Sequence, residues 1–235
     1  MHVAEIWRYP VKSMAGERLP WANVTPRGLS GDRIVQVRDR RGRIISSRTH
    51  HRLLGLSATL APDGTPLVNG RPWTSAEAAA AVRATVGDDG VLVRDDGIER
   101  FDVLPLLVAT DGAIAALGVD GRRLRPNIVI GGVDGLAERA WPGRQLRIGE
   151  VMIETVKLRG RCVMTTFDPD TLVQDLGVLR RIAQAFDGTM ALDSAVVHGG
   201  RIAIGDRVEL VERDDVNSPA ASSTSRPAAG LPRRA

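Results

Sequence analysis

The only cysteine of the chain, Cys162, is the residue with the most distinctive chemistry. It follows an expected strand, and two cations, Arg159 and Arg161, lie just before it. Neighbouring cations favour the thiolate, which is the form that attacks electrophiles and binds soft metals. A mononuclear metal site held by one protein thiolate, with its other ligands from a cofactor, is therefore chemically sensible. A lone cysteine is more often an inert buried side chain, so this interpretation requires a ligand pocket beside it.

Three further segments carry cations or polar side chains at expected strand ends, where they could bind an anion. Lys12 and Ser13 lie in a loop after a short strand, and a point charge beside a hydroxyl donor suits a phosphate. Arg33 begins another strand, while Arg125 and Asn127 flank a proline at the mouth of a third. Each segment alone fits an ordinary turn or a solvated surface. Together the five side chains predict a ligand pocket at the mouth of a barrel.

The elements expected to position these residues are mostly strands. Alternating hydrophobicity and turn residues predict strands over 33–38, 43–47, 54–60, 91–94, 106–109, 127–130, 151–156, 194–197 and 201–211, the last broken at Gly205-Asp206. Helices are predicted over 74–87, 111–117 and 176–186, the first opened by a capping box at Thr74-Ser75-Ala76-Glu77. Short strands between Gly and Pro turns indicate a mainly β fold with a few helices (α+β), as a barrel or sandwich.

Composition limits the class of protein. The 235 residues suit one large or two small domains, and a hydrophobic content of 43% is enough for a packed core. A single cysteine excludes an internal disulfide, an all-cysteine zinc site and a protein-held iron–sulfur cluster. The chain has neither a long apolar run nor a signal pattern, so we expect a cytoplasmic protein without membrane association.

The charge pattern bears on the kind of partner. The net charge is +4, and basic residues alternate with acidic ones instead of forming a stripe, so no nucleic-acid partner is expected. Nearly all of the basic residues are arginines, whose planar fork matches phosphate, and this favours an anionic small molecule. From residue 214 to 235 the chain has too few apolar residues to order itself, which predicts a disordered tail.

Four segments form a recognisable pattern in the order in which they occur. They are Tyr9-Pro10-Val11-Lys12-Ser13, 28–33, 125–130 and 161–171. On these motifs the chain resembles the MOSC proteins that carry an N-terminal β-barrel domain, such as the mitochondrial amidoxime-reducing component and its bacterial counterparts. The resemblance runs from about residue 1 to 212. It implies an N-terminal β-barrel-like domain over 1–95 packed with a MOSC β-barrel domain over 96–213, before the disordered tail at 214–235.

The resemblance implies a molybdenum atom held by the dithiolene of a molybdopterin and by Cys162, which would be both metal ligand and catalytic residue. The residues implied to hold this molybdenum cofactor are Lys12, Ser13, Arg33, Arg125, Asn127 and Arg161. Members of this type reduce small N-hydroxylated or N-oxide compounds by oxygen-atom transfer at the metal. The electrons would come from a separate protein of the ferredoxin, cytochrome or flavin reductase type, because one cysteine cannot hold a cluster.

The chain departs from the family motifs at three places. Relatives often carry Cys-Ser-Arg-Cys where this chain has Arg159-Gly160-Arg161-Cys162, and a Thr-Ser pair where it has Val103-Leu104. The glycine that follows Asp-Pro-Asp-Thr in relatives is replaced by Leu172. The serine and the Thr-Ser pair are hydrogen-bond donors, so these changes bear on how the cofactor is bound.

Two other functions remain open at the level of sequence. In the first, the chain is a non-catalytic carrier, in which Cys162 holds sulfur as a persulfide or the protein hands the molybdenum cofactor on. The second is a pyridoxal-phosphate function, for which only Lys12 and Lys157 could form the Schiff base.

Overall fold

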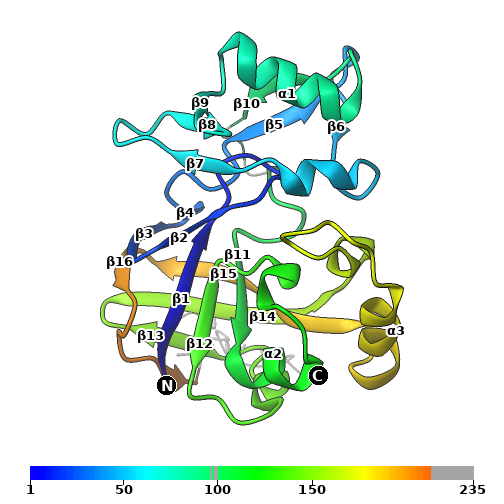
Figure 1. Cartoon of the computed structure of the whole chain (residues 1–235). Helices are drawn as coiled ribbons and strands as arrows, with labels where there is room; N and C mark the ends of the chain where they lie inside the picture. Colours follow the sequence, from blue (N-terminus) through cyan, green and yellow to red (C-terminus); the bar gives the residue numbers. More distant parts are fainter. Residues whose placement is uncertain (96, 98–99, 213–235) are drawn as a thin grey trace, which may run out of the picture.

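The computed structural model of the chain describes residues 1–95, 97 and 100–212. Within these ranges the chain forms two lobes, one above the other in Figure 1. The upper lobe holds most of residues 34–95, and the lower lobe holds both the first strands and the C-terminal half. The disordered tail predicted over 214–235 lies outside the described residues.

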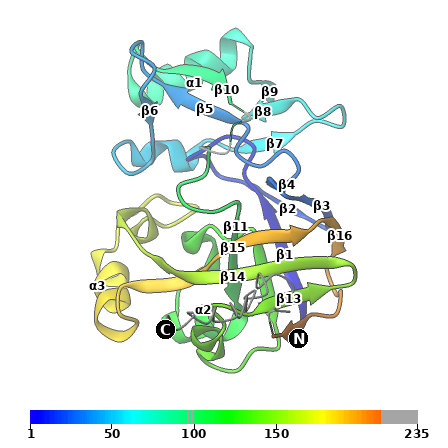
Figure 2. The same cartoon turned by 180° about the vertical axis from the view of Figure 1, so that it is seen from behind.

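The lower lobe is built around a curved mixed sheet (Figure 2). Its strands are β1 (His2–Arg8), β2 (Glu17–Leu19), β11 (Leu106–Thr110), β12 (Ile128–Gly131), β13 (Gln145–Ile148), β14 (Val151–Gly160), β15 (Thr189–His198) and β17 (Glu209–Val211). Within the described ranges their order across the sheet is β17-β13-β14-β15-β11-β12-β1-β2. A small sheet of β3 (Trp21–Thr25), β4 (Gly28–Leu29) and β16 (Gly200–Ala203) completes this lobe.

Helical elements cover the lower lobe on its outside. They are α2 (Asp111–Leu117), α3 (Leu176–Ala185) and the 3₁₀ turns η3 (Gly121–Leu124), η4 (Ala137–Ala140) and η5 (Val163–Thr166). The buried face of α3 is formed by Val178 and Ile182 and is continued by Phe186, which follows the helix at the same spacing, whereas Leu176 is 57% exposed. This helix therefore packs on the lobe through one narrow apolar stripe.

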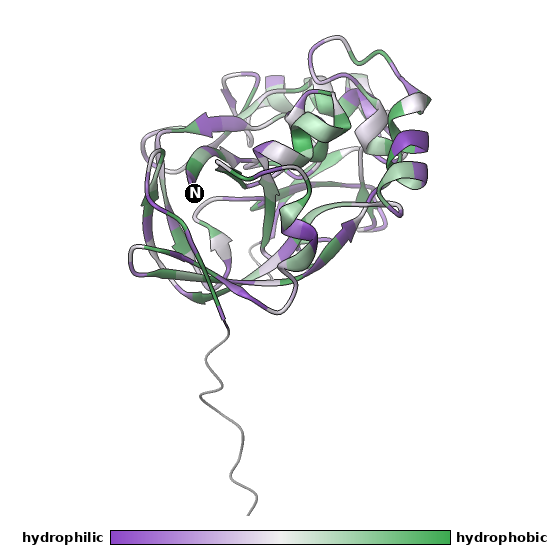
Figure 3. Ribbon diagram, turned by 90° about the horizontal axis from the view of Figure 1, so that it is seen from below, coloured by the Kyte–Doolittle hydropathy of each residue, from purple (hydrophilic) through white to green (hydrophobic). Residues whose placement is uncertain are grey.

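The upper lobe consists of two small sheets and one long helix. The elements are β5 (Val35–Arg38), β6 (Ile44–Ile45), η1 (His51–Gly55), β7 (Ala58–Leu60), β8 (Pro66–Val68), β9 (Arg71–Pro72), α1 (Ala76–Val86) and β10 (Val91–Arg94). The core of this lobe includes Val35, Val37 and Val82, which are fully buried. Hydrophobic residues lie on the strands of both lobes, as Figure 3 shows. Burial alternates along β3, where one face supplies the core, whereas β11 and β12 are buried at every position.

The predicted mainly β fold is confirmed, and the differences lie in individual elements. The three helices predicted from sequence form, but Ser75 rather than Thr74 caps the first, accepting a hydrogen bond from the Ala78 amide. The strand predicted over 54–60 is wrong in its first half, because η1 turns there to bury Leu53 and Leu54. A short apolar run fits a buried turn as well as a strand, so periodicity could not separate the two.

Strand boundaries also differ from the prediction. The break predicted at Gly205-Asp206 is confirmed, with a φ of +93° at Gly205, but the strands on its two sides, β16 and β17, lie in different sheets. Conversely, β14 and β15 are each longer than predicted, because they pair with one another along most of their length. The short strands β2, β3, β4, β8, β9 and β13 were not individually predicted from sequence.

Strand β1 connects the two lobes. It pairs with β12 of the lower sheet, with His2 opposite Gly131 and Ile6 opposite Ile128, and it runs up to the junction of the lobes (Figure 1). The N-terminal residues are thus hydrogen-bonded to the C-terminal half of the chain, and they deliver the segment after β1 to the junction. The predicted domain division near residue 95 stays a prediction.

Candidate functional site

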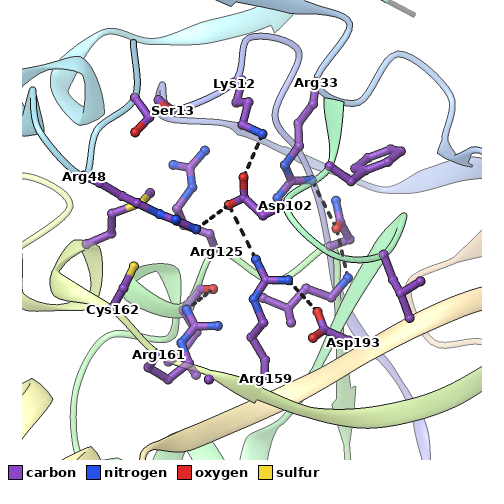
Figure 4. Close-up of a pocket in the computed structure, with 18 of the residues that line it drawn as sticks. Lys12, Ser13, Arg33, Arg48, Asp102, Arg125, Arg159, Arg161, Cys162 and Asp193 are labelled. Atoms are coloured by element: carbon purple, nitrogen blue, oxygen red, sulfur yellow. Dashed lines mark hydrogen bonds and ion pairs between the residues drawn. The ribbon is translucent and has the colours of Figure 1, made fainter. Parts of the chain in front are cut away.

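A pocket of about 300 Å³ lies between the lobes and contains the thiol of Cys162. The side chains predicted from sequence to hold a cofactor all line it, namely Lys12, Ser13, Arg33, Arg125, Asn127 and Arg161. The same pocket is lined by five charged side chains that the sequence-based site did not include: Arg48, Asp102, Arg123, Arg159 and Asp193. Figure 4 shows most of these groups pointing toward a common space.

Cys162 is positioned by the end of strand β14. It is the N-cap of η5, and its carbonyl accepts hydrogen bonds from the amide and the hydroxyl of Thr165, at 3.1 and 2.9 Å. The side chain is neither buried nor fully exposed. The thiol is therefore held at a strand end, on a tight turn, with access to the pocket (Figure 4).

Lys12 and Ser13 are presented by two buried neighbours. Val11 and Met14 are fully buried in the core of the upper lobe, which anchors the short segment on both sides. The Lys12 amide donates to the Val35 carbonyl at 2.8 Å, and the Lys12 ammonium donates to the Arg100 carbonyl, also at 2.8 Å. The segment is thus held by the upper lobe while its polar side chains face the junction.

Three of the predicted residues have left-handed backbone conformations. The φ angles of Ser13, Arg33 and Arg125 are +73°, +54° and +55°. For residues with a Cβ this conformation costs on the order of 1–2 kcal/mol, and such strain gathers at functional sites. Of the seven such residues other than glycine within the described ranges, these three line the pocket.

A buried aromatic ring organises the two arginines. The guanidinium of Arg125 lies 4.2 Å from the centre of the Tyr9 ring, and that of Arg33 lies 5.0 Å from it. Arg33 also pairs with the fully buried carboxylate of Asp32, which accepts a hydrogen bond from the Tyr9 amide at 2.8 Å. Cation–π contacts of this kind fix the direction of an arginine without using its hydrogen-bond donors.

Asn127 is engaged mainly by the protein itself. Its side-chain oxygen accepts hydrogen bonds from the Leu107 amide at 3.1 Å and from Arg33 at 3.3 Å. Its side-chain nitrogen donates to the Trp7 carbonyl at 3.3 Å. The buried amide therefore joins β1, β11 and Arg33 at the wall of the pocket, so its evident structural role is to hold these elements together.

Arg159 was noted from sequence as a cation near Cys162 but was not assigned to the cofactor site, although its position gave a signal. It lies two positions before Arg161 at the end of β14, and residues two apart on a strand share a face. Arg159 pairs with Asp193 at 2.6 Å, on the neighbouring strand β15. By contrast, Arg48 and Asp102 lie on irregular segments, where no periodicity points to a pocket.

The electrostatics of the pocket favour an anion. Among the described residues that line it, seven are cationic and two are carboxylates. Burial lowers the pKa of both Arg125 and Arg161 to about 10, so each remains a cation at neutral pH. The buried Nε of Arg161 has no hydrogen-bond partner within the described residues, although another nitrogen of the group donates to the Leu124 carbonyl at 2.7 Å. An anionic ligand would supply the missing acceptor and offset the excess charge.

Tyr9 provides a direct spectroscopic test of this geometry, because it is the only tyrosine in the chain. Its hydroxyl donates to the Pro126 carbonyl at 3.2 Å, and burial raises its pKa to about 12. We therefore expect the tyrosinate absorbance of the folded protein to titrate near 12, against about 10 for the unfolded chain. Replacing Arg125 by Met should raise the midpoint further, because the Arg125 charge stabilises the tyrosinate.

The same shift affects stability at high pH. Because the folded state holds the neutral phenol, its contribution is fully present below pH 10 and is lost as the pH rises toward 12. Two pKa units correspond to about 3 kcal/mol. A folded-state titration midpoint near 10 would contradict the buried position of the Tyr9 ring.

Comparison with known domain families divides the chain into two matching parts. Residues 1–104 match the MOSC N-terminal beta barrel domain, and residues 108–209 match the MOSC domain. The junction between the two matches falls on the segment that leads into β11, beside the pocket.

Individual proteins give the same relationship. The chain is 30% identical to mitochondrial amidoxime-reducing component 1 of Homo sapiens, over 72% of this chain and 67% of that protein. It is 29% identical to mitochondrial amidoxime reducing component 2 of Macaca fascicularis, over 74% and 68%. Among solved structures, the YUAD protein of Bacillus subtilis shares the fold, with a TM-score of 0.51, 10% identity and coverage of 90% and 96%.

The helices bear on membrane association. The longest helix in the described part of the chain, α1, has 11 residues, fewer than are needed to span a bilayer.

The ordered motifs, the two domain matches and the relatives agree on one assignment. The chain belongs to the MOSC family, with an N-terminal MOSC β-barrel domain, and it is a homologue of the mitochondrial amidoxime-reducing components.

Proposed function

We propose that the protein is a molybdenum-cofactor-dependent reductase of N-hydroxylated or N-oxide compounds, with Cys162 as the protein ligand of the metal. The observation that supports this most is the partly exposed thiol in a pocket whose charged side chains are mainly cations. A thiolate suits a soft metal centre, and the cations suit the anionic groups of a pterin cofactor. The homology to proteins named as amidoxime-reducing components supports the substrate class.

The residues present fit such a cofactor. Arg161 carries a buried donor without a partner, and the guanidinium of Arg125 makes no hydrogen bond within the described part of the chain. These donors, together with Lys12 and Ser13, would bind the phosphate and pterin, while Cys162 would ligate the metal. When bound, the molybdenum cofactor supplies a centre that cycles between oxidation states two electrons apart. The protein orients this centre and balances its charge.

The overall reaction determines how many electrons and protons must reach the site from outside the protein. An N-hydroxylated substrate takes up two electrons and two protons, its N–O bond breaks, and the products are the N–H compound and water. The pocket is open to solvent beside Cys162, so water can deliver the protons. We propose that the electrons come from a separate donor of the ferredoxin, cytochrome or flavin reductase type, since the single cysteine of this sequence cannot hold an iron–sulfur cluster.

The proposal is tested on full-length protein from a host that makes the cofactor. We expect about one molybdenum per chain by elemental mass spectrometry, as for a mononuclear site with one thiolate ligand. We also expect turnover of benzamidoxime with a chemical electron donor. Stoichiometric metal without turnover of any N-hydroxylated or N-oxide compound would reject the enzyme. A reductant-labile sulfur on Cys162 in protein without molybdenum would instead favour the carrier function.

A further inference from the structure

The carboxylate of Asp102 occupies the middle of the cation cluster (Figure 4). It lies 2.7 Å from the Lys12 ammonium, 3.2 Å from the Arg48 guanidinium and 3.5 Å from the Arg159 guanidinium. Burial raises the pKa of Asp102, but these three cations outweigh burial and hold the pKa below its ordinary value. Asp102 is therefore ionised at neutral pH and behaves as an anion bound by its own protein.

Two of the three cations are held in place without Asp102. The Lys12 ammonium also donates to the Arg100 carbonyl at 2.8 Å. Arg159 is paired with Asp193 at 2.6 Å, and the Asp193 side chain is only 2% exposed. The third cation, Arg48, is 52% exposed and can follow a ligand. Removal of Asp102 would therefore leave a preorganised anion site rather than a collapsed one.

Within the described residues, Asp102 is held in the cluster by its side chain. It belongs to the segment between β10 and β11 that links the lobes, and its side chain is 35% exposed. Within the described ranges its backbone makes no hydrogen bond. The carboxylate can therefore leave the cluster by rotation of its own side chain, while its neighbours Arg100 and Phe101 stay buried and Arg100 keeps its hydrogen bonds to the Asp32 and Arg27 carbonyls.

We propose that Asp102 is an internal counter-ion that makes the site formed by Lys12, Arg48 and Arg159 selective for doubly charged phosphate groups. A monoanion that replaces the Asp102 carboxylate makes no stronger charge interactions with the three cations than the carboxylate did. Its binding also costs the translational and rotational entropy that it had in solution. A phosphate dianion brings a second charge and additional acceptor oxygens, so it displaces Asp102. This inference rests on the proposed function, since the phosphate of the cofactor is the group that would be selected.

The test uses the full chain from a host that makes no cofactor, and it measures anion binding rather than activity. Inorganic phosphate is titrated by calorimetry at constant ionic strength and about pH 8, where it is mostly dianionic. We expect Asp102→Asn to tighten phosphate binding by about tenfold or more. Asp170→Asn is the matched control, because it removes the same charge from the exposed pair with Arg122 and should leave binding unchanged.

A comparison of phosphate with nitrate binding adds a readout on the wild-type protein, which does not depend on how the Asp102→Asn variant folds. The wild-type protein should bind phosphate but not nitrate, whereas Asp102→Asn should bind both. Asp102→Asn that binds phosphate no more tightly than wild type would overturn the proposal, as would equal binding of the two anions by the wild type. Because neither readout needs molybdenum, a failure here is distinct from a failure of the reductase activity.

Discussion

Replacing Cys162 by Ala should abolish molybdenum retention and all reductase activity while leaving the fold intact. The thiol is the only one in the chain, and it is the protein ligand in the proposed site. Because the side chain is partly exposed at a strand end, loss of its sulfur should change the free energy of unfolding by less than about 1 kcal/mol. The melting temperature should then fall by no more than about 4 °C. Metal analysis and thermal unfolding of the same sample give both results.

Met164 supplies the matched control for the Cys162 substitution. It lines the same pocket and also carries sulfur, and its thioether accepts a hydrogen bond from Ser47 at 3.4 Å. Met164→Leu conserves volume without providing or removing a thiolate, so it should retain molybdenum. Full metal content in Cys162→Ala, or equal loss in both variants, would show that the thiol is not the ligand.

Replacing Asp32 by Ala should destabilise the protein by about 3 kcal/mol. Asp32 is fully buried, and its carboxylate both pairs with Arg33 and accepts a hydrogen bond from the Tyr9 amide. Its removal leaves a cation and an amide without their buried partner, which costs more than the loss of a surface pair. Asp32→Asn keeps an acceptor for the Tyr9 amide and should cost less.

Chemical unfolding with urea measures these differences. The control is Asp89→Ala, which breaks the pair between Asp89 and Arg40 at 2.8 Å, where the two side chains are 64% and 72% exposed. Such a surface pair contributes about 0–1 kcal/mol. Equal losses for Asp32→Ala and Asp89→Ala would mean that Asp32 does not hold Arg33 and Tyr9 together.

The departure at Leu172 shows how sequence and structure complement each other. The resemblance implied a glycine where this chain has Leu172, and the structure gives this residue a φ of +58°. The backbone there retains a conformation that favours glycine. The Leu172 side chain reaches the upper lobe, where it approaches Gly55 of η1 so closely that a Cβ on Gly55 would lie 2.9 Å from it. This contact between the lobes has no signature in local sequence.

Much of the site could be predicted because its residues lie at motifs and strand ends. Lys12 and Cys162 are 150 positions apart, yet both follow strands of one sheet and line the same pocket. The mainly β architecture was equally accessible, because period-two hydrophobicity reports directly on which face of a strand is buried. The short strands and η1 were missed or misplaced because runs of two to four residues carry too little pattern.

By itself the sequence determined the chemistry available to this protein: one thiol, an excess of arginine and a β framework to present them. Only the tertiary structure decided which charges meet. It places Asp102 among three cations, turns Asn127 into a link between strands, and leaves a donor of Arg161 without an acceptor among the residues described. The physical reason is that these contacts depend on how β1 pairs with β12 and how the lobes pack, and pairing between distant segments leaves no period in the chain.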